Sequence, residues 1–142
     1  MSSNTVRKAS AAEPAFTNLS DAEALAARLD PWPAFDPACV LGGNPNGHRG
    51  KVLFRSPDGR YSIGIWECDA AKLVNAYPGT ESGHVLKGRA RLRDVATGEV
   101  QDLRAGDNFF LAFGRTVEWE ILEPFRKVYT MYETAWDGER FY

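Results

Sequence analysis

Residues 61–88, YSIGIWECDAAKLVNAYPGTESGHVLKG, are the stretch that decides the predicted fold. Along its first part, large apolar side chains alternate with a second set of residues, which is typical of a β-strand. The first set is Tyr61, Ile63 and Ile65, and the second is Ser62, Gly64 and Trp66. KLVNAY at 72–77 continues in the same strand-forming composition. We interpret the stretch as one wall of a small β-barrel that carries one acidic residue of interest, Glu81.

The chain on both sides of this stretch has the same character. Upstream, KVLFRS and the turn PDGR form a hairpin with the strand that begins at Tyr61. Downstream, short runs rich in Val, Ile, Phe, Tyr and Trp follow one another at regular intervals: HVLKGRARLRDV, VQDLRAGDNFFLAF, VEWEILE and RKVYTMYETAW. No helical periodicity or internal repeat is visible between residues 51 and 136. We therefore predict an all-β domain over 51–142, with roughly eight strands in an antiparallel sandwich or barrel.

The first 50 residues have a different composition. Residues 1–17 are mostly small and polar and are predicted to form a flexible tail. Within 18–50, Ser20 is a suitable N-cap for one short helix in NLSDAEALAARL, which Asp30-Pro31 should end. The stretch 31–50, PWPAFDPACVLGGNPNGHRG, is rich in Pro and Gly, which favours an extended arm. Its aromatic residues Trp32 and Phe35 are expected to be buried against this barrel or a partner's.

Composition excludes some classes of function. With 17 Lys and Arg against 19 Asp and Glu, the formal charge is only −2, which argues against binding to nucleic acid or to an anionic membrane. The N-terminal residues have no apolar run behind them and no window reaches about 18 apolar residues, so we expect no signal peptide, no membrane span and a cytoplasmic protein. The two cysteines, Cys39 and Cys68, are expected to stay reduced.

Several short motifs between residues 60 and 134 resemble one family. They are WEC at 66–68, YP at 77–78, E-x-x-x-V-L-x-G at 81–88, GD at 106–107, and VEWEILEP at 117–124 followed by Arg126 and Lys127. Together they resemble the cupin superfamily, in the branch of ureidoglycine aminohydrolase-like and ethanolamine-utilisation-Q-like small single-domain cupins. The resemblance implies a jelly-roll barrel whose open end holds the pocket. It also implies a homodimer, for which the Pro-rich arm offers a clasp.

The same resemblance implies where metal ligands would lie, namely at two His before a Glu and at one later His. In this chain Glu81 keeps the Glu, whereas Asn75, Tyr77 and Val117 stand at the His positions. One carboxylate and one amide are a poor ligand set for a transition metal. We therefore expect no cofactor, with Glu81 the only candidate ligand. A hard divalent ion such as Mg²⁺, held largely by water, is the exception.

Strand parity indicates which side chains share the barrel interior. Counting by twos from Asn75 places Asn75, Tyr77 and Glu81 inward. We predict Glu81 and Tyr77 as catalytic, because a carboxyl and a phenol in an apolar pocket can exchange protons with a ligand. The predicted ligand-binding residues are Asn75, Trp66, Val117 and Trp119. The alternatives are that Glu81 only closes the barrel end through a hydrogen bond and that Trp66 and Trp119 only fill the core.

The remaining polar candidates are weaker. His48 lies in the loop-like sequence NPNGHRG and is predicted to be solvated, whereas His84 faces away from Glu81, toward the surface or a dimer interface. Arg126 and Lys127 match family positions, but their facing is not assigned from the sequence.

Three hypotheses for function follow. The first is a small-molecule-binding cupin that acts as a metal-independent isomerase, epimerase or lyase. The second is a non-catalytic cupin that senses or carries a ligand. The third is a metal-dependent hydrolase-like cupin, which the missing histidines disfavour.

Overall fold

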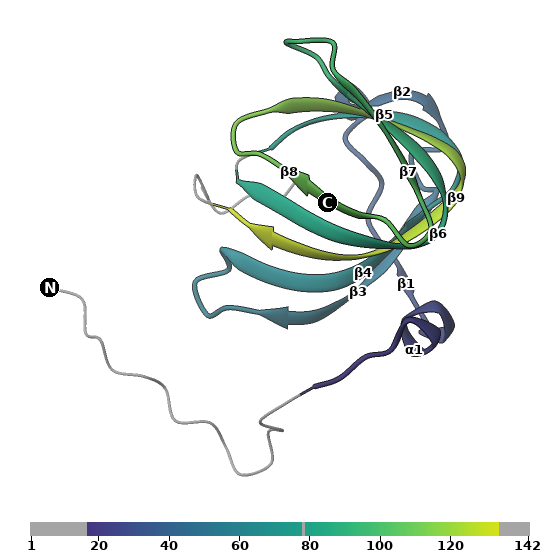
Figure 1. Cartoon of the computed structure of the whole chain (residues 1–142), viewed down its shortest axis with the longest axis vertical. Coiled ribbons are helices and arrows are strands. Elements are labelled where there is room, and N and C mark those ends of the chain that lie inside the picture. Colours follow the sequence, from purple (N-terminus) through teal and green to yellow (C-terminus); the bar gives the residue numbers. More distant parts are fainter. Residues whose placement is uncertain (1–16, 78, 134–142) are drawn as a thin grey trace, which may run out of the picture.

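A computed structural model describes residues 17–77 and 79–133 of the chain. In this part, nine strands form one antiparallel sheet that curls into an open barrel (Figure 1). The strands are β1 (Asp30–Pro31), β2 (Val40–Gly43), β3 (His48–Arg55), β4 (Tyr61–Cys68), β5 (Ala71–Ala76), β6 (Thr80–Asp94), β7 (Val100–Arg104), β8 (Asn108–Leu111) and β9 (Thr116–Tyr132). The predicted all-β antiparallel fold with a jelly-roll shape is confirmed. Most of the predicted tail over 1–17 lies outside the described residues, as do the last nine residues of the predicted barrel domain.

Strand β9 is the centre of the sheet. Its first half pairs with β5 and its second half with β4, while β6 runs along its other edge. Because side chains alternate along a strand, every second residue of β9 points into the barrel. The buried apolar residues of this series are Val117, Trp119, Ile121, Phe125, Tyr129 and Met131. Their neighbours Glu118 and Glu120 are only partly buried and face the other side.

Strand β6 bends where it passes from β8 to β7. Gly88 has a positive φ of 85°, a conformation that side chains other than glycine rarely adopt. A Cβ atom at this position would also collide with the carbonyl oxygen of Pro124. The glycine thus allows β6 to bend while it stays close to β9. As a result the first part of β6 pairs with β8 and its second part pairs with β7.

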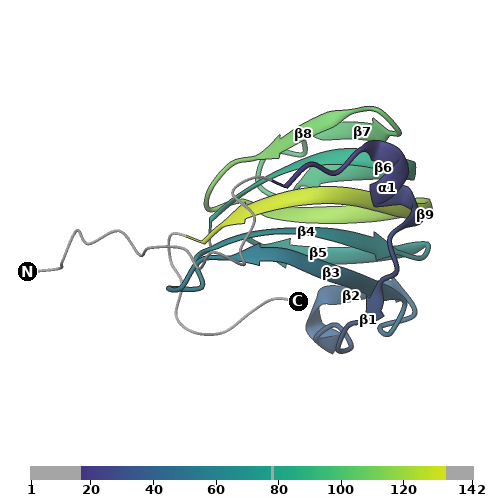
Figure 2. The same cartoon turned by 90° about the horizontal axis from the view of Figure 1, so that it is seen from below.

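The helix α1 (Asp21–Ala26) begins as predicted, with Ser20 and Glu23 forming a capping box. It ends at Ala26, four residues before Asp30. Figure 2 shows it on the outside of the sheet beside β6, where Ala24 packs against Ile65 and Leu86. No helix in the described ranges is both long and apolar enough to span a membrane.

The Pro-rich arm lies on its own barrel. β1 pairs with the first residues of β3, and β2 pairs with β5, with the short 3₁₀ helix η1 (Pro37–Cys39) between them. Phe35 is 3% exposed and belongs to the main core, with Trp32 packed beside it. β3 begins at His48, three residues before the predicted start of the barrel domain at Lys51.

Candidate functional site

Asn75 and Tyr77 lie together on the inner wall of the barrel. Asn75 is the last inward residue of β5, and the backbone N–H of Tyr77 donates to the carbonyl of Arg115, at 2.9 Å. This bond extends the strand pairing past the end of β5, so the alternation that faces Asn75 inward also faces Tyr77 inward. The two side chains are 7% and 5% exposed.

Both side chains line a cavity of about 660 Å³, a volume typical of small-molecule sites. Its other lining residues come from strands β3, β4 and β9, from the residue after β9, and from the arm: Val52, Arg55, Ser62, Tyr129, Met131, Glu133, Trp32, Pro33, Ala34 and Asp36. The arm therefore closes one side of the cavity. The sequence alone left the role of this segment open.

The hydroxyl of Tyr77 is held by three side chains. Trp119 Nε1 donates to it at 2.8 Å, and it also hydrogen-bonds with Glu81 and Asn75. Burial, followed by the charge of Glu81, raises the pKa of Tyr77 well above its ordinary value, although the bonds from Trp119 and Asn75 lower it. The phenol is therefore protonated at neutral pH and acts as a hydrogen-bond donor to Glu81.

Glu81 lies behind Tyr77 and does not line the cavity. Its side chain is fully buried, and its Oε2 accepts a hydrogen bond from Lys127 Nζ at 2.5 Å. The lysine is equally enclosed, with a side chain that is 2% exposed. Four aromatic rings surround its ammonium group, those of Trp66, Phe109, Trp119 and Tyr129. The polar groups thus form a chain from Lys127 through Glu81 to Tyr77 and the cavity wall.

The residues around Glu81 do not make the ligand set that the resemblance implies for a metal. Asn75, Tyr77 and Val117 replace the expected imidazoles, and the carboxylate is already paired with Lys127. Among the described residues, no group of three or more His, Cys, Asp or Glu side chains could hold a metal ion. These donors do not fit a transition metal.

The other three predicted ligand-binding residues lie away from the large cavity. Trp66 and Trp119 are buried in the core, edge to face at 6.2 Å between ring centroids. Val117 lines a separate cavity of about 210 Å³ at the side of Asp94 and Arg115. Of the six predicted site residues, the structure brings only Asn75 and Tyr77 to the wall of the large cavity, with Glu81 directly behind them.

The prediction that His48 is solvated is wrong, because its side chain is buried under the arm. Its Nε2 donates to the carbonyl of Pro33 at 2.7 Å, and its Nδ1 accepts from Trp66 Nε1 at 3.1 Å. Phe35 stacks on the imidazole, at 3.7 Å between ring centroids. These bonds require the neutral form with its proton on Nε2, and burial lowers the pKa of His48 accordingly. The neutral histidine thereby fastens the arm over the cavity.

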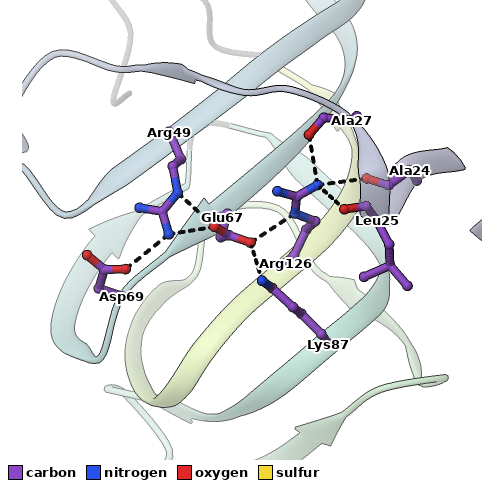
Figure 3. A network of polar contacts seen from close by, with 8 residues as sticks. All are labelled: Ala24, Leu25, Ala27, Arg49, Glu67, Asp69, Lys87 and Arg126. Atoms are coloured by element: carbon purple, nitrogen blue, oxygen red, sulfur yellow. Dashed lines mark hydrogen bonds and ion pairs between the residues drawn. The ribbon is translucent and has the colours of Figure 1, made fainter. Parts of the chain in front are cut away.

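A second buried carboxylate, Glu67, lies on the outer face of the sheet (Figure 3). It accepts hydrogen bonds or ion pairs from Arg49, Lys87 and Arg126, whose nitrogens are 2.5 to 2.9 Å away. Burial alone would raise the pKa of Glu67, but the bonds from Lys87, Arg126 and Arg49 outweigh it and lower the pKa to about 2. Arg126 also donates to the carbonyls of Ala24, Leu25 and Ala27, so this cluster fastens α1 to the barrel.

Sequence reasoning missed Lys127, although a signal for it was present. Counting by twos from Val117 reaches Lys127, Tyr129 and Met131, all of which face the interior. A lysine at an inward position of a central strand is rare, because an unpaired charge there is costly. Its position therefore called for a buried acidic partner, and Glu81 is that partner.

Comparison with known proteins identifies the family of this chain. The sequence model of the family described as the EutQ-like cupin domain matches residues 55–129, which is more than half of the chain. No curated protein sequence matches the chain significantly.

Among solved structures, the protein described as ethanolamine utilization protein Q from Salmonella typhimurium is 24% identical, with a TM-score of 0.54 over 61% of this chain and 69% of that one. The EutQ protein of Clostridium difficile is 20% identical, with a TM-score of 0.56 over 72% of this chain and 82% of that one. A protein of unknown function from Pseudomonas syringae pv. tomato is 24% identical, with a TM-score of 0.66 over 79% of this chain and 46% of that one. These structures agree with the fold seen here, and the sequence match over residues 55–129 means that the chain belongs to the EutQ-like cupin domain family.

Proposed function

We propose that this chain is a small-molecule-binding cupin whose ligand occupies the cavity between the barrel and the arm. The observation that carries the proposal is the buried amide of Asn75 on the wall of that cavity. An asparagine side chain has two donor hydrogens and an acceptor oxygen, and its bond to Tyr77 uses only part of this capacity. Aromatic and apolar walls with a few fixed polar groups are the usual composition of a small-molecule site.

Proton transfer through Tyr77 is a second candidate, which would make the protein a metal-independent isomerase, epimerase or lyase. It is favoured by the position of the phenol, which touches the cavity on one side and Glu81 on the other. In such a reaction the Tyr77 hydroxyl first rotates its O–H from Glu81 toward the ligand and then donates the proton to it. The phenolate that remains accepts hydrogen bonds from Trp119 and Asn75 and regains a proton from a second position of the ligand, so that no proton is gained or lost overall. Glu81 acts only through Tyr77, because it does not line the cavity.

The binding proposal is tested with a library of small organic acids, amines and polyols, observed by ligand-detected NMR. The affinity of any compound that binds is then measured by calorimetry for wild type, Asn75→Leu and Tyr77→Phe. We expect Asn75→Leu to weaken binding about tenfold or more, because the ligand loses a buried hydrogen-bond partner. Gln101→Ala, an exposed change remote from the cavity, is the control. The proposal fails if no compound binds, or if Asn75→Leu leaves every affinity unchanged.

Catalysis is separated from binding by the effect of Tyr77→Phe. If the ligand is converted, the variant should keep its affinity within a few-fold and lose turnover, since only the transferable proton is removed. Unchanged turnover would exclude Tyr77 as the proton donor, and absence of any turnover in wild type would leave the carrier or sensor role.

The homodimer expected from the resemblance stays a prediction. One edge that suits it is β3 beyond Gly50, where β1 no longer pairs and Val52, Leu53 and Phe54 are between 39% and 49% exposed. Light scattering on the purified chain measures the assembly, and a monomer at all concentrations would contradict the prediction.

A further inference from the structure

We infer that the ammonium group of Lys127 is the barrel's own cation, held at Glu81 in the place that the metal-binding pattern gives to a metal ion. The two groups are in direct contact, with 2.5 Å between Lys127 Nζ and Glu81 Oε2. Both side chains are withdrawn from solvent, at 2% and 0% exposure. A buried carboxylate requires a partner of opposite charge, and here the chain itself supplies it.

The wall around this ammonium suits an organic cation better than a metal. Its Nζ lies 4.4 Å from the ring centroid of Trp119 and 4.6 Å from that of Trp66. The rings of Phe109 and Tyr129 are further away, at 5.5 and 5.9 Å. Aromatic faces attract an ammonium group electrostatically, but they offer no lone pair of the kind that a divalent metal binds. The aromatic cage formed by these four rings therefore favours the lysine ammonium over a divalent metal ion.

The backbone fixes this cation in position. Lys127 lies opposite Trp66 on β4 and opposite Val85 on β6, so its Cα is held by strands on both sides of β9. The aromatic cage then limits the rotamers of the side chain. Such an ammonium cannot be exchanged with solvent ions, unlike a metal bound by side chains alone.

Lys127 is thereby a positioning residue for the cavity. It fixes the Glu81 carboxylate, which accepts a hydrogen bond from the Tyr77 hydroxyl, so the lone pairs of the phenol face Trp119 and Asn75. This sequence of bonds sets which polar atoms the cavity wall presents. Only this last step rests on the proposed function, because the cation assignment itself involves no ligand.

The first test is a calorimetric titration of the purified full chain with MnCl₂ and with ZnCl₂. We expect wild type and Glu81→Gln to give the same result, with no binding that depends on Glu81. One equivalent of metal bound by wild type and lost in Glu81→Gln would overturn the assignment. This titration does not depend on whether any Lys127 variant folds, and its outcome is independent of ligand binding in the cavity.

The second test is chemical rescue of Lys127→Ala. This change removes three carbons and the ammonium group, which together correspond to n-propylammonium. We expect n-propylammonium to raise the midpoint of thermal unfolding of Lys127→Ala by about 5 °C or more. It should not do so for wild type or for the double variant Lys127→Ala/Glu81→Gln, in which the carboxylate is absent.

The matched control is 1-propanol, which has a similar size and no charge. If it raises the midpoint of Lys127→Ala as much as n-propylammonium does, the space is filled for its volume alone and the cation role is excluded. The cation role is also excluded if n-propylammonium raises the unfolding midpoints of Lys127→Ala and of Lys127→Ala/Glu81→Gln equally.

Discussion

Two neighbouring residues of β9 pair a buried base with a buried carboxylate on opposite faces of the same sheet. Arg126 faces outward to Glu67, and Lys127 faces inward to Glu81. Outside, one carboxylate is shared by three cations, and Arg126 also bonds three carbonyls at the end of α1 (Figure 3). Inside, one ammonium and one carboxylate meet among aromatic rings.

The difference between the two clusters lies in what remains when one member is lost. In the outer cluster each member keeps other partners when one is lost, since Glu67 has three cations and Arg49 also bonds Asp69. In the inner pair, removal of either side chain takes away the direct ionic partner of an enclosed charge, which is strongly unfavourable. The inner pair should therefore be sensitive to single changes and tolerant of paired ones.

The largest effect is expected for single changes of the inner pair. Lys127→Met and Glu81→Gln should each lower the free energy of unfolding by about 3–5 kcal/mol, because each removes the direct ionic partner of a buried charge. The double variant should be more stable than either single variant, since no charge remains. Urea unfolding of all four proteins measures this cycle. If the two losses simply add in the double variant, the two side chains are not coupled.

A smaller effect is expected at the outer carboxylate. Glu67→Gln should lower the free energy of unfolding at neutral pH by about 1–3 kcal/mol, because the negative charge is lost. The loss is smaller than for the inner pair because a hydrogen-bonding group of the same shape is kept. The pKa of Glu67 is lowered from 4.5 to about 2, so the folded state binds its proton less readily than the unfolded state. The stability that it contributes is therefore complete above pH 4.5 and is lost as the pH falls toward 2.

Thermal unfolding of wild type and Glu67→Gln between pH 2 and 7 measures this contribution. The difference in unfolding midpoint between wild type and Glu67→Gln should become smaller as the pH falls from 4.5 toward 2. A gap that stays constant with pH would show that Glu67 acts through packing and not through its charge.

The smallest effects are expected from the two histidines, and they should have opposite signs. Burial lowers the pKa of His48, so its contribution is present above the ordinary value of 6.5 and is lost as the pH falls below it. Hydrogen bonds from His84 to Asp21 and Asn108 raise the pKa of His84. Its contribution is present below 6.5 and is lost as the pH rises through the raised value.

Substitution separates the two histidines. His48→Gln should flatten the acid side of the stability profile, and His84→Gln the neutral side by about 0.5–1 kcal/mol, since its ion pair with Asp21 is partly exposed. Thermal unfolding across pH 5 to 8 gives both profiles. If both variants change the same side, the assignment of one histidine is wrong.

Local pattern was sufficient for the parts of the molecule that depend on neighbours in sequence. Strand parity placed Asn75, Tyr77 and Glu81 inward, and the composition around Ser20 identified the start of α1. Both are properties of short stretches, in which side-chain alternation or a single cap determines the outcome.

The parts that the sequence did not show depend on distant contacts. His48 follows turn residues, and only the arrival of Phe35 and Trp66 makes its site dry. Strand parity marks Lys127 as inward-facing, but its partner Glu81 lies 46 residues earlier in the chain and is identified only once β6 and β9 pair. The arm was predicted as extended, but its place beside the cavity depends on pairing between segments far apart in the chain.

The central place of β9 also affects the order in which the molecule can be assembled during synthesis. β4, β5 and β6 all depend on β9 for one of their edges, yet β9 follows them in the sequence. While the ribosome is still making residues before 116, these strands have no seam to join and expose unpaired edges. Closure of the barrel, including the Lys127–Glu81 pair, must therefore wait until β9 has left the ribosome. Until that moment the open edges of β4, β5 and β6 are available for incorrect pairing.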